Sequence, residues 1–95
     1  MGGILELFDS DSSFALPAKM DVDAAHRLKG TLLRHRNQPL LIDASDVQQM
    51  STLCLQVLLS AQKSWRREGY GFVVRNPSPA FRDSVALLGA ETLLP

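Results

Sequence analysis

Residues 40–68 read LLIDASDVQQMSTLCLQVLLSAQKSWRRE and contain the two patterns from which the architecture can be predicted. The continuous apolar run from Leu40 to Ile42 is typical of a strand that lies centrally in a sheet and is buried on both faces. From Met50 to Glu68 the apolar residues recur at helical spacing, which predicts the longest helix of the chain. Its broad apolar arc comprises Cys54, Leu55, Val57, Leu58, Leu59, Ala61 and Trp65. The opposite stripe, expected to face water or a partner, comprises Gln56, Ser60, Lys63 and Arg67.

A second amphipathic helix is expected to start near Asp21, upstream of this stretch. Its apolar positions, spaced i, i+3 and i+7, are Ala25, Leu28 and Leu32. Asp21 or Asp23 can cap its first turn, and Pro39 is expected to close it. The basic residues Arg27, Lys29, Arg34 and Arg36 fall mostly in other directions, as on a solvated helix face. His26 and His35 lie on the same polar side and are expected to be solvated.

Downstream of the long helix the sequence predicts one more strand and one more helix. Gly69 fits a helix C-cap, and the segment 71–74, GFVV, has the pattern of another short buried strand. Ser78 and Pro79 follow as an N-cap and a first helical residue. Phe81, Val85 and Leu88 supply an apolar face, and Gly89 ends this helix.

At the N-terminus, Ile4–Phe8 and Phe14–Leu16 are two short apolar segments around a polar turn, which predicts an opening hairpin. The strands that follow are separated by helices, and such connections favour right-handed crossovers and a parallel sheet. The fold class is therefore α/β: a small, mostly parallel sheet of about four strands, an opening hairpin, and three or more helices packed against it.

Composition narrows the function classes. With 95 residues the chain is expected to form one domain spanning residues 1–95. Ten Lys and Arg balance ten Asp and Glu, so no overall basic field favours nucleic-acid binding. One cysteine, no basic N-terminal leader and no long apolar run favour a cytoplasmic protein without direct membrane insertion.

Several segments, in their order and spacing, resemble the STAS domain, the family of anti-sigma factor antagonists that also occurs in sulfate transporters and in a lipid-transport complex. Family members have an Asp before the first helix and a strand ending in Asp, then a Val-x-x-hydrophobic-Asp-Ser-Ser-Gly-Leu segment and an Asn-Pro-Ser-Pro turn. The matching positions here are Met20-Asp21, Ile42-Asp43, Val47–Leu55, Val73–Pro79 and Leu87-Leu88-Gly89. The resemblance implies a protein-binding regulatory module.

The phosphoacceptor motif of that family is degenerate in this sequence. Phosphorylated antagonists carry a Ser where this chain has Leu53, and Ser51 and Cys54 replace the Asp and the Gly of the motif. Thr52 stands at the first Ser, as in lipid-transport members. A shift of one residue would make Thr52 or Ser51 the acceptor, and the alternative is that one of these hydroxyls only caps the helix.

The sequence gives little support for an enzymatic function. No phosphate-binding loop, nucleophile elbow or metal-ligand spacing is present, so we expect no catalytic residue, no cofactor and no metal. Cys54 lies among apolar residues, as a buried free cysteine does. Asp43 and Asp46 could hold a cation, but Asp43 is more simply a residue that stabilises its loop, and Asp46 a turn residue.

The expected function is that of a non-enzymatic regulator that works by partner switching, through loop 43–50 and the start of helix 51–68. Its partner would be an anti-sigma factor or serine-kinase-like regulator, with a chemotaxis or stress pathway as the setting. The predicted binding residues are Asp43, Asp46, Gln48, Gln49, Ser51, Thr52, Gln56, Ser60 and Lys63. The alternative is a cytoplasmic subunit of an ABC-type lipid transport complex that binds its ATPase. The apolar tail at Leu93 and Leu94 and an open sheet edge also leave room for a homodimer.

Overall fold

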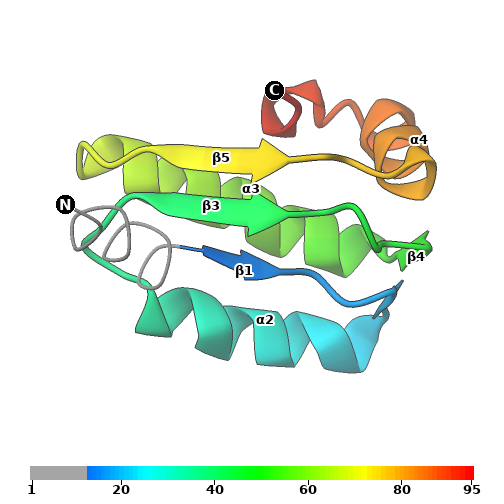
Figure 1. Ribbon diagram of the computed structural model, residues 1–95, viewed down its shortest axis with the longest axis horizontal. Coiled ribbons are helices and arrows are strands. Elements are labelled where there is room, and N and C mark those ends of the chain that lie inside the picture. The colour runs from blue at the N-terminus through cyan, green and yellow to red at the C-terminus, as the bar shows by residue number, and fades with distance from the viewer. Residues whose placement is uncertain (1–12) are drawn as a thin grey trace, which may run out of the picture.

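The computed structural model describes residues 13–95 and shows a small parallel α/β domain (Figure 1). The main sheet has three parallel strands in the order β1-β3-β5, which are β1 (Ser13–Ala15), β3 (Leu40–Asp43) and β5 (Phe72–Arg75). A second, two-stranded parallel sheet pairs β2 (Lys19–Met20) with β4 (Gln49–Met50). The helices are α2 (Val22–Arg34), α3 (Thr52–Arg67), α4 (Pro79–Leu88) and the short 3-10 helix η1 (Glu91–Leu93).

The two long helices are the crossovers between neighbouring strands of the main sheet. Helix α2 connects β1 to β3 and α3 connects β3 to β5, and both crossovers are right-handed (Figure 1). Because the strand order never reverses, α2 and α3 lie on the same side of the sheet and run in the same direction. The prediction of a small parallel sheet with three helices is confirmed, but the main sheet has three strands among the described residues rather than about four.

The core lies between this sheet and the two helices. Leu40, Ile42, Phe72 and Val74 are buried toward the helices, and β3 is the central strand, as its apolar run predicted. The prediction that β3 and β5 are buried on both faces is wrong. Leu41 in β3 is only half-buried, and Val73 in β5 is 46% exposed. The physical reason is that both crossover helices pack on one side, so alternate strand residues point away from them.

The helix ends follow the predicted capping chemistry with two corrections. The carboxylate of Asp21 accepts a hydrogen bond from the Ala24 N–H at 2.9 Å, and Gly89 ends α4 in the left-handed conformation with φ of 66°. Helix α2, however, ends at Arg34, well before Pro39. Helix α3 begins at Thr52 rather than Met50, because residues 49 and 50 pair with β2 as strand β4. A two-residue strand gives no periodic signal, which is why β2 and β4 could not be predicted.

Two expectations concern the N-terminal part of the chain. The first arm of the expected hairpin, Ile4–Phe8, lies outside the described residues, and β1 pairs in parallel with β3. His35 is half-buried and stacks on Phe14 with the ring centroids 5.3 Å apart, so the expectation that both histidines are solvated is wrong. His26 is exposed as expected.

Candidate functional site

The loop between β3 and β4 is held at the carboxyl end of the main sheet. The Ala44 N–H donates to the Arg75 carbonyl at 2.9 Å, and the Ser78 N–H donates to the Ala44 carbonyl at 3.1 Å. Ala44 and Val47 are fully buried, while Asp46 is exposed at the turn between them. The loop therefore presents its polar side chains from a backbone that is fixed at both β5 and α4.

Ser78 ties the first turn of α4 to this loop. Its hydroxyl donates to the Val47 carbonyl at 2.6 Å and accepts from the Phe81 N–H at 3.1 Å, and the side chain is buried. The sequence predicted the capping role from the Ser-Pro pair. The bond to Val47 spans 31 residues of sequence, so no local pattern could have predicted it.

The far end of the loop is held by β2 and by Ala18, the residue just before it. The N–H groups of Gln48 and Gln49 both donate to the Ala18 carbonyl, at 2.8 and 3.0 Å, and the Ser51 N–H donates to the Met20 carbonyl at 2.8 Å. These bonds fix the point at which α3 starts. The side chains of Gln48 and Gln49 remain exposed.

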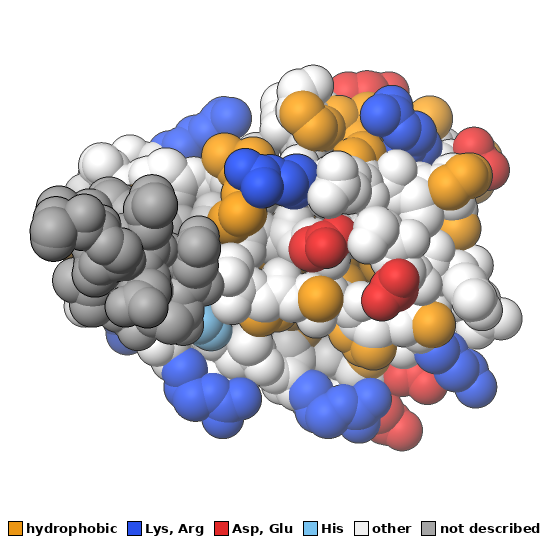
Figure 2. All heavy atoms as spheres, viewed as in Figure 1, with side chains coloured by type: hydrophobic (Ala, Val, Ile, Leu, Met, Phe, Trp, Pro, Cys, Tyr) orange, Lys and Arg blue, Asp and Glu red, His pale blue; other side chains and the backbone are white. Residues whose placement is uncertain are grey.

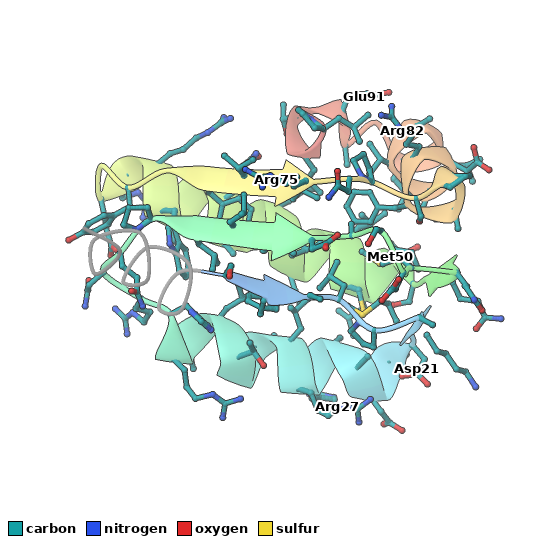
Figure 3. The ribbon with its side chains drawn as sticks, in the orientation of Figure 1. Asp21, Arg27, Met50, Arg75, Arg82 and Glu91 are labelled. Atoms are coloured by element: carbon teal, nitrogen blue, oxygen red, sulfur yellow. The ribbon has the colours of Figure 1, made fainter. Side chains whose placement is uncertain are left out.

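Asp43 stabilises the start of the loop, as the sequence suggested. Its carboxylate accepts a hydrogen bond from the Ser45 N–H at 2.9 Å. Hydrogen bonds from the backbone and side chain of Ser45 hold the pKa of this carboxyl below its ordinary value of 3.8, and the positive charge of Arg75 adds to the effect. Asp43 and Arg75 are register partners on the face of the sheet turned away from α2 and α3, and Figure 3 shows Arg75 on β5.

We expect replacement of Asp43 by Asn to change how stability depends on pH. Because folding lowers the pKa of Asp43, its charge stabilises the fold above the ordinary value of 3.8 and loses this effect as the pH falls through the lowered pKa. The wild type should therefore be more stable than Asp43→Asn near neutral pH, with the difference shrinking in acid. Urea unfolding of both proteins between about pH 6 and about pH 3 measures this, and a difference independent of pH would contradict the prediction.

The start of α3 separates the two candidate phosphoacceptors. The Ser51 hydroxyl is half-buried and accepts a hydrogen bond from the Cys54 N–H at 3.2 Å, so Ser51 is the N-cap. Thr52 is the first residue of the helix and its side chain is exposed. Leu53, which aligns with the Ser of the phosphoacceptor motif described above, is 36% exposed.

Cys54 is a core residue. It is fully buried, and its thiol lies within hydrogen-bonding distance of the Met20 and Asp21 carbonyls, with Sγ at 3.4 and 3.3 Å from these oxygens. These contacts tie α3 to the beginning of α2. The expectation of a buried free cysteine is confirmed.

The predicted binding residues do not all share one face: Asp43 lies on the face of the sheet turned away from α2 and α3, whereas Gln56 and Ser60 line the space between these two helices. Asp43 and Ser51 are half-buried and take part in the hydrogen bonds described above. The other predicted side chains are exposed, namely Asp46, Gln48, Gln49, Thr52, Gln56, Ser60 and Lys63. The structure thus provides exposed polar side chains on a loop and helix start whose backbone is held by hydrogen bonds.

A groove between α2 and α3, of about 520 Å³, includes two of these residues, Gln56 and Ser60, and was not predicted. Its lining residues are Lys29, Leu32, Leu33, Arg36, Leu53, Gln56, Val57, Ser60, Ala61, Ser64, Trp65 and Glu68. The sequence signal for it was Leu33, an apolar residue outside the buried stripe of α2, which is 62% exposed.

Two side chains in the C-terminal half of α3, Gln62 and Trp65, donate hydrogen bonds to backbone carbonyls of neighbouring segments. The Trp65 indole N–H donates to the Gln38 carbonyl at 2.8 Å, and the ring packs edge-on against Phe72 with centroids 5.7 Å apart. The Gln62 amide donates to the Thr92 carbonyl at 2.8 Å and is buried. Trp65 is therefore mainly a core residue.

Within residues 13–95, no group of three or more His, Cys, Asp or Glu side chains is placed to hold a metal ion. None of the helices in that range is both long and apolar enough to cross a membrane.

Comparison with known protein families identifies this chain's family. A protein-family model described as "Mlab, STAS domain" matches residues 8–95, which is almost the whole chain. No curated protein matches the sequence.

Proposed function

The chain belongs to the STAS domain family, and from this premise we propose that it is a non-catalytic, cytoplasmic regulator that acts by binding a protein partner. The binding surface consists of loop 43–50 and the exposed side of α3 that follows it. The partner is an anti-sigma factor or a serine-kinase-like regulator, and partner switching is the mode of action.

The observation that carries this proposal is the combination of a rigid backbone with exposed, mostly uncharged side chains. The backbone is fixed to Ala18 before β2, to Arg75 in β5 and to Ser78, the N-cap of α4, by the bonds of Gln48 and Ala44. Such preorganisation reduces the conformational entropy lost on binding. Gln48, Gln49, Thr52, Gln56 and Ser60 are exposed on it, and uncharged side chains are less costly to desolvate in an interface than charged ones.

Phosphorylation of Thr52 would give this surface a switch. Thr52 is exposed at the N-terminus of a helix 16 residues long, where unpaired N–H groups and the helix dipole favour a negative charge. A phosphoryl group adds about 1.5 to 2 negative charges and would alter the surface that contacts the partner. Ser51 is the weaker acceptor, because its hydroxyl already caps the helix.

A second candidate function rests on Leu53. An apolar side chain that is 36% exposed at the usual acceptor position suits a permanent contact better than a switched one. This favours a STAS subunit that binds the ATPase of an ABC-type lipid transporter without phosphorylation. The same surface would be used, but the partner would differ.

We expect affinity capture to identify the partner. The tagged protein is used as bait in native cytoplasm and in detergent-solubilised membranes of its own source, and bound proteins are identified by mass spectrometry. Enrichment of a kinase or anti-sigma-like regulator supports the first function, and phosphate on Thr52 in that sample supports the switch. Enrichment of a transporter ATPase supports the second function. A bait that retains no protein above a tag-only control in either fraction contradicts both.

A further inference from the structure

The positive charge of this neutral chain is concentrated on its two crossover helices. Residues 21–36 and 52–68 contain seven of the ten Lys and Arg but only three of the ten Asp and Glu. Their formal charge is therefore +4, and that of the remaining sequence is −4. Figure 2 shows Lys and Arg side chains along the edge formed by α2, and Figure 3 shows Arg27 directed away from the sheet.

The groove lies between α2 and α3, the two helices that carry this positive charge. Four buried apolar side chains form its floor, namely Leu32, Val57, Ala61 and Trp65. Leu33 from α2 and Leu53 from α3 border it and are 62% and 36% exposed. The groove therefore contains apolar surface that water now covers and that a partner could bury.

The shape of the groove fits a helix. Its α3 side runs from Leu53 to Glu68, a distance of roughly 22 Å at 1.5 Å per residue, which corresponds to about four helical turns. Eight of its twelve lining residues are exposed, so the groove is open along its length. A small-molecule site would instead enclose most of its ligand.

The charges at the rim indicate which helix would fit. On the α2 side the rim carries Lys29 and, just beyond the helix end, Arg36. On the α3 side it carries the uncharged Gln56, Ser60 and Ser64, and Glu68 is the only acid among the lining residues, at the end of the groove. Acidic side chains on the α2-facing edge of a bound helix would thus meet the positive charges of Lys29 and Arg36.

From these observations we infer that the groove binds an amphipathic helix of a partner protein, with an apolar stripe against Leu33 and Leu53 and acidic residues facing α2. Lys29 and Arg36 are seven residues apart, so the matching acids should be about two turns apart on the bound helix. This inference rests on the proposed function and specifies its partner, but it uses Lys29 and Leu33, which are not part of the surface proposed above.

A synthetic peptide tests this inference directly. The probe is a 16-residue amphipathic helix with leucines at i, i+3, i+4 and i+7 and two glutamates seven residues apart on one edge, and the matched control carries lysines at those two positions. Fluorescence anisotropy with the full chain should show the glutamate peptide binding at least about ten-fold more tightly than the lysine peptide. Leu33→Asp and Lys29→Glu should each reduce the affinity for the glutamate peptide by about ten-fold. Both side chains are exposed, so neither change should unfold the domain.

Other outcomes overturn the inference. Equal affinities for the two peptides, or no binding of either, would exclude an acidic helix. Dodecanoate that shifts the amide resonances of the groove residues, when the peptide does not, would indicate a small apolar ligand. A dimer in sedimentation velocity that Leu33→Asp dissociates would indicate a second copy of the chain.

The affinity capture separates failure of this inference from failure of the proposed function. A captured partner that Leu33→Asp still retains, but that a change at Ser60 releases, would overturn the groove and leave the proposed function standing. Binding of the glutamate peptide without capture of any protein would support the groove and contradict the proposed function.

Discussion

Replacing Phe81 by Ala should lower the free energy of unfolding by about 3–5 kcal/mol, the range found when a buried aromatic ring is removed. Phe81 is fully buried and is the largest completely buried side chain among residues 13–95. Its N–H also binds the Ser78 hydroxyl, which in turn holds the Val47 carbonyl. The cavity left by the ring would therefore loosen the part of α4 that supports the binding loop.

Urea unfolding followed by circular dichroism measures this change, with Leu87→Ala as the matched control. Leu87 lies on the same helix and is 86% exposed, so its truncation should alter stability by no more than about 0.5 kcal/mol. Domains of this size are stable by about 5–15 kcal/mol, so Phe81→Ala should remove a large fraction of the total. Equal effects of the two substitutions would show that Phe81 does not support the core as described.

Much of the fold could be predicted because its determinants are local. The apolar run at Leu40, the helical period after Ser51 and the capping residues Asp21, Ser78 and Gly89 each depend on neighbours within a few positions. The strand β3 was expected to be central, and it is.

Features that depend on long-range packing could not be predicted. Strands β2 and β4 have two residues each and exist because they pair with each other across about 30 residues of sequence. The exposure of Val73 follows from the placement of both crossover helices on one side of the sheet, which no pattern within β5 reveals. Helix α2 ends at Arg34, with His35 as its C-cap, so Pro39 lies beyond the helix and does not set its end.

The candidate site divides in the same way. The exposed stripe of α3 follows from helical periodicity, and Gln56, Ser60 and Lys63 are exposed as predicted. The bonds that hold the loop, from Ala18 to Gln48 and from Ser78 to Val47, join segments far apart in the sequence. The groove needs both helices at once, so Leu33 on α2 could not be assigned to the same surface as Leu53 on α3 before their arrangement was known.

The exposed side of α3 should be the contact surface for the partner, and a charged side chain placed there should abolish most of the binding. Ser60 is exposed near the middle of α3, where it is one of the predicted binding residues and also lines the groove. Ser60→Glu adds bulk and a negative charge without disturbing a buried group, so the fold should be retained. At the centre of an interface such a change costs about 2 kcal/mol or more, which is roughly a 25-fold increase in Kd.

Ala86→Glu provides the matched control. Ala86 is exposed on α4, outside the proposed surface, so the same side chain introduced there should leave affinity unchanged. Circular dichroism and the urea midpoint should be close to wild type for both variants.

The most direct test of protein binding through α3 is therefore the affinity of the captured partner for the wild type, Ser60→Glu and Ala86→Glu, measured by isothermal titration calorimetry. We predict that Ser60→Glu raises Kd by roughly 25-fold while Ala86→Glu does not change it. An unchanged affinity of a folded Ser60→Glu variant would place the contact elsewhere on the domain and contradict this account.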